Sequence, residues 1–227
     1  MYALNPCMHP GCRQNAISTI DENGNISEEP GYCPTHQEDL TVALGKILDY
    51  IRTHDKVVGL NVQGLTITDI DFTKKKFYGC NMQHCVFSNV NFAEARARMC
   101  VFNFSTFTDC YPIRSNIQFS SYAGCKFVHT LFTDSDLIHN NFNGITAYQC
   151  SFDNSDLYNT RFIKAILINT SLKNCNLKKT VFYDSMRDGV SFKLSNTREA
   201  LIDRNKGGLM GDFDERFDYE EDKARKL

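Results

Sequence analysis

Large apolar side chains recur at every fifth position along the middle of the chain, a spacing that fits neither a helix nor a simple strand. There are 25 such positions from Val62 to Phe182; apolar residues fill 24 of them, Pro112 is the exception, and 12 of the 17 phenylalanines fall here. A helix repeats its buried face about every 3.6 residues and a strand every two. A repeat of five therefore requires a chain that turns once in every unit.

A second, smaller inward residue precedes each large one by two positions. This column runs from Leu60 to Thr180 and holds Ala, Ser, Thr, Cys or Val at 19 of its 25 positions, while the rest of each unit is mostly polar. Residues two apart on an extended chain point to the same side. Because each unit turns the same way, the chain must wind around an axis, which predicts an all-β solenoid stabilised by contacts between successive coils.

The individual units resemble those of the pentapeptide-repeat family, which read roughly A-(D/N)-(L/F)-x-x. Close matches are "SDLIH" (135–139), "SDLYN" (155–159) and "CNLKK" (175–179), and the resemblance covers about residues 60 to 184 in one register. It implies a right-handed quadrilateral β-helix of about six coils, with four units in each. Equivalent side chains would then stack along one face of the tower, as in the set Phe102, Tyr122, Phe142, Phe162 and Phe182.

The pattern divides the chain into four segments. We predict a Cys/His segment over 1–36, a capping helix over 37–56, the β-helix over 57–194, and a short helix with a charged tail over 195–227. The first helix is predicted because Leu44, Ile47 and Ile51 have helical spacing. It would cover the first coil, whose interior and backbone are otherwise exposed. Pro112 and Ala97 are expected to interrupt the regular coils.

The ten cysteines fall into two groups. Seven occupy the small inward column and are expected to be free thiols that act as small apolar side chains. The other three, Cys7, Cys12 and Cys33, precede the helix with His36 in a C-x4-C-x20-C-x2-H spacing that resembles a zinc knuckle. Three sulfurs and one nitrogen suit a tetrahedral structural zinc site, so we predict one zinc ion there. The alternatives are reduced cysteines without metal, or His9 in place of His36.

Charge distinguishes between the roles that the resemblance implies. Some bacterial pentapeptide-repeat proteins imitate duplex DNA and protect DNA gyrase. Residues 60–192 contain 13 Lys or Arg against 10 Asp or Glu, and a slightly basic tower is poorly suited to imitate a polyanion. A DNA-mimic regulator of a type II topoisomerase is therefore the second interpretation. The surplus of basic over acidic residues in the tower is also too small to predict nucleic-acid binding.

The first interpretation is a non-enzymatic protein–protein interaction scaffold with an unidentified protein partner. His129 lies near Asp109 and Gln149, but on a convex face we expect these side chains to form a solvated ladder. Contiguous outward apolar residues often mark interfaces. Two candidate groups are Met99, Phe119, Ile138 and Tyr158, and then Ile163, Ile166 and Ile168.

The resemblance also implies a possible homodimer through the C-terminal end of the tower. The chain contains no apolar run long enough to span a membrane, and its first residues do not resemble an export signal. Both features predict a cytoplasmic protein.

Overall fold

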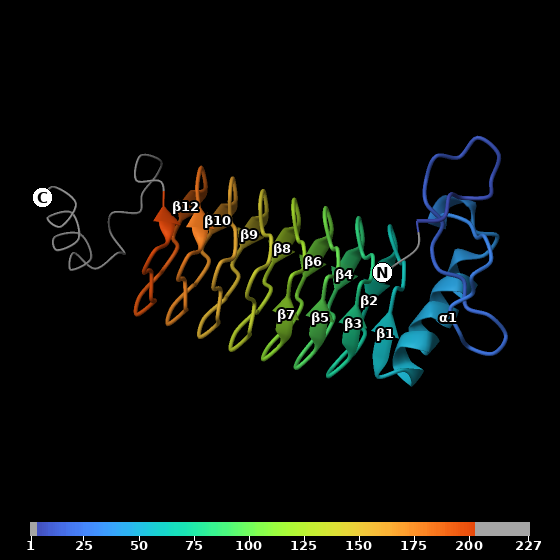
Figure 1. Ribbon diagram of the computed structural model, residues 1–227, viewed down its shortest axis with the longest axis horizontal. Helices are drawn as coiled ribbons and strands as arrows, with labels where there is room; N and C mark the ends of the chain where they lie inside the picture. The colour runs from blue at the N-terminus through green and yellow to red at the C-terminus, as the bar shows by residue number, and fades with distance from the viewer. Residues whose placement is uncertain (1–3, 203–227) are drawn as a thin grey trace, which may run out of the picture.

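The computed structural model describes residues 4–202, which form a β-solenoid of about seven turns with one helix at its N-terminal end. In Figure 1 the coils follow one another along the long axis, and helix α1 (Leu40–Thr53) lies beside the first coil. None of the helices among these residues has the length and apolar character needed to cross a membrane.

All paired strands of the tower are parallel, and they form three sheets. The first sheet contains β1 (Lys56–Val58), β3 (Lys76–Tyr78), β5 (Arg96–Arg98) and β7 (Asn116–Gln118). The second contains β2 (Thr66–Thr68), β4 (Val86–Ser88), β6 (Thr106–Thr108), β8 (Lys126–Val128), β9 (Thr146–Tyr148), β10 (Ile166–Ile168) and β12 (Met186–Asp188). The third pairs β11 (Val181–Phe182) with β13 (Leu201–Ile202).

Strand register shows that one coil takes four five-residue units. Lys56 pairs with Lys76 and Thr66 pairs with Val86, so equivalent positions are separated by 20 residues. Isolated bridges continue the first sheet beyond β7, from Asn116 to Asp136 and onward to Asn196. We call this side of the tower the β1 face and the side formed by the second sheet the β2 face.

The inward aromatic rings stack on their equivalents one coil away, as the repeat predicts. The ring centroids of Phe102 and Tyr122 are 4.6 Å apart, and those of Tyr122 and Phe142 are 4.9 Å apart. The stack continues from Phe142 to Phe162 at 5.2 Å and from there to Phe182 at 5.0 Å. Each fully buried side chain of this size contributes roughly 1.5–3 kcal/mol to folding.

The small inward column satisfies buried backbone groups. Asn140, which is 2% exposed, donates from Nδ2 to the carbonyls of Ile117 and Leu137 at 2.7 and 2.8 Å, and its Oδ1 accepts from the Ser120 amide at 2.9 Å. The cysteines are all free thiols. Burial raises the pKa of Cys85 to about 12, which suits a packing role rather than a reactive one.

Most units turn through a residue in the left-handed region of backbone space. Asn154 and Asn159 adopt it with φ of 60° and 54°, and asparagine tolerates this conformation well. Met99, Phe104 and Phe119 adopt it too, with φ of 52°, 60° and 52°. For such bulky side chains the conformation costs about 1 kcal/mol or more, so turn formation does not explain their presence.

The N-terminal end of the tower is covered by helix α1 and by the segment before it. Asp39 caps the helix by accepting a hydrogen bond from the Val42 amide at 3.0 Å, and Ile47 and Ile51 are buried against the first coil. At the other end of the helix, Lys75 donates from Nζ to the carbonyls of Arg52 and His54 at 2.7 and 3.2 Å. A cation at the C-terminal end of a helix also interacts favourably with the helix dipole.

Three details of the predicted fold were wrong. The tower has about seven turns, not six, because the coils continue beyond Asp188. The short helix predicted from Ser195 is absent over residues 195–202: Asn196 bridges to Asn176, and β13 pairs with β11. The predicted irregularity at Ala97 and Pro112 is also absent, because Ala97 pairs in register within β5 and the coil passes through Pro112. The charged tail lies outside the described residues.

Replacing Phe142 by alanine tests the inward stack. This ring is fully buried between those of Tyr122 and Phe162, so we expect the free energy of unfolding to fall by about 3–5 kcal/mol. Urea denaturation followed by circular dichroism measures the change. The control, Lys126→Ala, removes an exposed side chain from β8 and should alter stability by less than about 0.5 kcal/mol. Wild-type stability in the Phe142 variant would contradict the assignment.

Candidate metal centre

Two short turns place the four predicted ligands of the N-terminal segment. In the first, the Cys7 amide donates to the Gln14 carbonyl at 2.9 Å, closing a hairpin whose turn includes Gly11 at φ of 78°. In the second, the 3-10 helix η1 (Pro34–His36) follows Cys33, and the His36 amide donates to the Cys33 carbonyl at 2.9 Å. The two turns bring pairs of ligands that are distant in sequence into one cluster.

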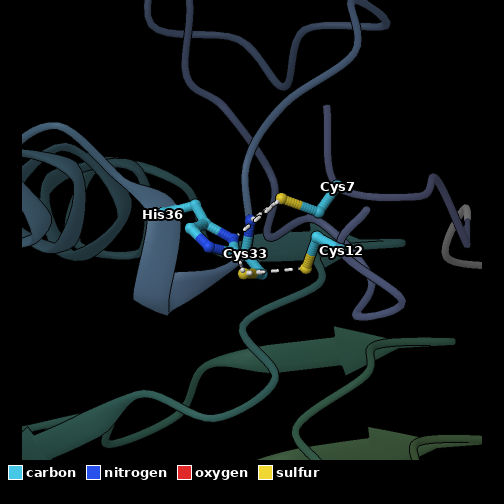
Figure 2. Close-up of side chains that lie close together, drawn as sticks. All are labelled: Cys7, Cys12, Cys33 and His36. Carbon is cyan, nitrogen blue, oxygen red and sulfur yellow. Dashed lines mark hydrogen bonds between the residues drawn. The ribbon is translucent and has the colours of Figure 1, made fainter. Parts of the chain in front are cut away.

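The geometry of this cluster fits a tetrahedral ion (Figure 2). The Sγ atoms of Cys12 and Cys33 are 3.9 Å apart, and His36 Nδ1 lies 3.6 Å from Cys7 Sγ and 3.3 Å from Cys33 Sγ. All four ligand atoms lie within 4.8 Å of one another. Around a zinc ion with ordinary bond lengths, the sulfur–sulfur and sulfur–nitrogen edges measure roughly 3.8 and 3.6 Å.

Backbone amides point at two of the sulfurs. The amide of Cys33 donates to Cys7 Sγ at 3.3 Å, and that of Gln14 donates to Cys12 Sγ at 3.4 Å. Burial opposes ionisation of Cys7. Hydrogen bonds from Cys33, His9 and His36 outweigh it and lower the Cys7 pKa to about 6. At Cys12 the Gln14 amide favours the thiolate, but burial and the nearby sulfurs raise the pKa overall. Thiolates are the form in which cysteine binds zinc.

The histidine of the cluster is His36 rather than His9. The two imidazole rings stack, with centroids 3.9 Å apart and planes 4° apart, but His9 Nδ1 faces the Pro10 carbonyl at 3.1 Å. His9 therefore stacks on His36 and is not one of the four clustered ligands. The predicted grouping of three cysteines with His36 is present, and as a set of four protein ligands it would leave an ion no open position for catalysis.

The cluster lies at the end of the tower and is connected to it through the backbone. The Ser18 amide donates to the Asn61 carbonyl at 2.7 Å, and the Asn61 amide donates to Ser18 Oγ at 2.9 Å. Asn61 also donates from Nδ2 to the Ala16 carbonyl at 2.8 Å. An ion at the cluster would thus fix the segment that completes the exposed edge of the first coil.

The structure brings the first predicted interface group together on one corner of the tower. Phe119 is 57% exposed, and its ring stacks on His139 at 4.9 Å; His139 meets the Tyr158 ring edge-on at 5.7 Å. Met99 lies one coil before Phe119 in the same column, and Ile138 precedes His139. We call these five residues the corner patch. The sequence interpretation missed His139, although it occupies the same position as Phe119, one coil later.

The second predicted group lies near the other end of the tower. Ile166 and Ile168 belong to β10 on the β2 face, and Ile163 lies on the adjoining side. The structure adds Tyr148, which pairs with Ile168, and Met186, which pairs with Ile166. These five residues form the β10 patch. The added residues lie 20 positions from the isoleucines, a relation that becomes visible only when the sequence is written in coils.

The grouping around His129 has the geometry of a ladder. His129 Nδ1 lies 3.1 Å from Asp109 Oδ1 and Nε2 lies 2.8 Å from Gln149 Oε1, with His129 and Asp109 about half exposed. The same arrangement recurs elsewhere on the tower, where Asn154 donates to Asp134 at 3.0 Å. Both imidazole nitrogens are thus engaged by neighbouring coils, and the solvated ladder is the better description of this group.

Comparison with known proteins supports the repeat assignment. The family model described as pentapeptide repeats matches residues 68–111 and 146–184 in 8 copies. A search of curated protein sequences finds no match to this chain.

Similar solved structures include full-length QnrB1, described as a plasmid-mediated fluoroquinolone resistance protein, at 15% identity and a TM-score of 0.32, with 62% of this chain and 90% of that chain covered. HetL, a pentapeptide repeat protein involved in heterocyst differentiation regulation in the cyanobacterium Nostoc sp. strain PCC 7120, is 12% identical with a TM-score of 0.25; the match covers 69% of this chain and 93% of that one. Rfr23 of the cyanobacterium Cyanothece 51142 is 12% identical with a TM-score of 0.25, over 71% of this chain and 100% of that one. At these values the similarity carries no functional argument. On the family match and the five-residue register together, the tower of this chain is a pentapeptide-repeat β-helix.

Proposed function

We propose that this protein is a non-enzymatic scaffold for protein–protein interaction, and that its N-terminal segment holds one structural zinc ion. The tower presents flat, rigid sides on which side chains repeat at the strand spacing of about 4.8 Å. Recognition by such a surface depends on which side chains stand in each column. We assign the protein to the cytoplasm, since ten free cysteines suit a reducing compartment.

The β10 patch is the observation that carries the scaffold proposal. Met186, Tyr148 and Ile166 are 59%, 40% and 36% exposed, and they lie on neighbouring strands of one parallel sheet. Earlier positions in the same columns are more polar, as with Thr106 and Lys126. Polar side chains at these outward positions are therefore compatible with the fold. The apolar side chains near the C-terminal end, such as Ile166 and Met186, need another explanation. An interface with a second protein supplies one.

The zinc proposal rests on the fit of the four ligand atoms and on the composition of the segment around them. Cys33 is fully buried and Cys7 is 7% exposed, and a buried thiolate requires a compensating positive charge. A bound zinc ion would provide it, and it would hold the hairpin and the 3-10 helix together. Residues this early in the chain otherwise contribute few large apolar side chains to the core, such as Ile17 and Ile20.

The second candidate is a DNA-mimic regulator of a type II topoisomerase. The resemblance to the pentapeptide-repeat family, some of whose members imitate duplex DNA, is the reason to retain this candidate. Mimicry of duplex DNA requires a continuous negative surface. The β1 face instead begins with Lys56, Lys76 and Arg96 in register, so this candidate remains second.

Metal analysis of the purified protein tests the zinc site. We expect about one zinc per chain, lost in Cys33→Ser because a closed site needs all four ligands. Cys110→Ser is the matched control, because Cys110 is a small inward residue and the equivalent residues of the units before and after it are Ser105 and Ser115. This variant should retain the metal. Absence of metal from the wild type, or equal zinc in both variants, would refute the proposal.

Affinity capture with quantitative mass spectrometry tests the β10 patch. We compare the wild type with the double variant Ile166→Lys and Ile168→Thr, whose new side chains already occur in these columns at Lys126 and Thr108. A genuine partner should be captured by the wild type and reduced about tenfold or more by the variant. Thr66→Lys, at the first coil of the same column, should leave capture unchanged. If no captured protein depends on the patch, the proposed interface is wrong.

A DNA gyrase supercoiling assay separates the two candidates. We expect the protein neither to inhibit supercoiling nor to protect the enzyme from a quinolone, because the positive start of the β1 face repels a DNA-binding surface. Inhibition at concentrations comparable to that of the enzyme would reverse the ranking.

A further inference from the structure

One column of side chains on the β1 face is ordered by charge along the whole tower. The column contains, at successive coils, Lys56, Lys76, Arg96, Asn116, Asp136, Asp156, Asn176 and Asn196. Each member pairs in register with the next, so the spacing is the strand spacing of about 4.8 Å. The charge changes sign once, at Asn116 in the middle.

The basic half of the column lacks anionic partners. Lys56, Lys76 and Arg96 are exposed, and no ion pair within residues 4–202 involves any of them. Like charges one strand spacing apart repel each other. Lys56 Nζ lies over the Tyr78 ring at 5.2 Å, a contact that does not neutralise it. This half therefore favours an anionic partner from outside the chain.

The acidic half is held in place by amide groups rather than cations. Asp136 Oδ2 accepts hydrogen bonds from Asn116 at 3.0 Å and from Gln118 at 2.6 Å. Asp156 Oδ1 accepts from the Tyr158 amide at 2.9 Å and from Asn176 at 3.0 Å. These donors fix the carboxylates without supplying an opposite charge. Arg98 is near enough to Asp136 to attract it electrostatically, but its guanidinium donates hydrogen bonds to Asn116.

We propose that the β1 face binds the same face of a second copy, with the two towers antiparallel and the two-fold axis crossing the tower at Asn116. This operation places each column opposite itself with its direction reversed. Lys76 then meets the partner's Asp156, and Arg96 meets the partner's Asp136. Symmetry forms each pair twice, which gives four facing charge pairs, while Lys56 faces the partner's Asn176.

The repeat distance argues for a second copy over other anionic partners. Both columns advance by the same strand spacing, so all of the charge pairs align at once. Carboxylates on successive turns of an acidic helix, at positions i and i+4, advance by about 6 Å and fall out of step with the cations. A nucleic acid would satisfy Lys76 and Arg96 but would be repelled by Asp136 and Asp156.

The same axis brings Met99, Phe119 and His139 of the corner patch onto themselves, and it places Ile138 and Tyr158 opposite the partner's Arg98 and the partner's Tyr78. Phe119 occupies the coil of Asn116, so it would pack against the partner's Phe119, while Met99 would meet the partner's His139. Phe119 and Met99 are 57% and 62% exposed and adopt the left-handed conformation that bulky residues avoid. Burial of these side chains in the dimer offsets that conformational cost.

This inference deepens the proposed function, because it names the occupant of one of the two surfaces. The corner patch and the β1 face would meet a second copy, and the β10 patch on the β2 face would remain free for a different protein. The two proposals can therefore fail separately. The arrangement uses a different surface from the C-terminal end of the tower, and the homodimer that the family resemblance implied there stays a separate prediction.

The contact is narrow, which sets the expected affinity. From Lys56 to Asn176 the column advances six strand spacings, or about 29 Å, along one side of the tower. Interfaces that bury less than about 1,200 Å² in total are weak or transient. We expect a dimer with a micromolar Kd that dissociates as salt is raised from about 50 mM to about 500 mM, because exposed charge pairs are screened.

Complementary charge reversal, followed by sedimentation velocity, tests the proposal. The first variant, Lys76→Glu with Arg96→Glu, leaves Lys56 as the only cation of the column; the second, Asp136→Lys with Asp156→Lys, leaves the column without an anion. Each should be monomeric alone, with an affinity at least about tenfold weaker than that of the wild type. A mixture of the two should form a one-to-one heterodimer, since the four facing pairs at positions 76/156 and 96/136 are then opposite in charge.

The control variant is Lys173→Glu with Lys193→Glu, which makes the same change of net charge at exposed positions on another side of the tower. It should dimerise like the wild type. If the second variant does not fold, Asp136→Asn with Asp156→Asn keeps hydrogen-bonding groups of similar size and should still bind the first variant. A monomeric wild type, a dimer that survives the first variant, or a mixture that stays monomeric would overturn the proposal.

Discussion

Stacking of each inward side chain on its equivalent one coil away is the contact on which the rest of this structure depends. Phe142 lies between Tyr122 and Phe162 with ring centroids 4.9 and 5.2 Å away. The parallel backbone ladder sets this spacing, and the rings fill the interior that the ladder leaves. Since each coil contacts only its neighbours, the same interaction that builds the tower also leaves an unfinished surface at each end.

The N-terminal segment covers the exposed first coil and provides hydrogen-bond partners for its backbone. Asn61 lies on the first coil, where no earlier coil can accept or donate its hydrogen bonds, and Ser18 and Ala16 provide them instead. Lys75 occupies an inward position that holds a small residue in most other units, but its amine reaches the end of α1. A metal at the cysteine cluster would therefore stabilise the cap on which the first coil depends.

The central fold and the N-terminal cap could be predicted because they follow from local repetition and spacing, whereas the C-terminal end of the tower could not. The column of large residues fixed the register of Phe102 and Phe182, and the cysteine spacing identified all four members of the cluster. The segment from Ser195 looked like a capped helix, yet it continues the coils because its backbone pairs with the previous turn. That pairing is a contact over 20 residues, and local propensity does not report it.

The charge on the β1 face was missed for a related reason. Residues 60–192 contain 13 basic and 10 acidic residues, and such nearly equal totals do not indicate a charged patch. The same residues read at intervals of 20 separate into a basic run and an acidic run. In a solenoid the neighbour that matters electrostatically is one coil away, at about 4.8 Å, rather than next in sequence. The charges at positions 76, 96, 136 and 156 of this column are complementary to those of the same column in reverse, which a net charge near zero conceals.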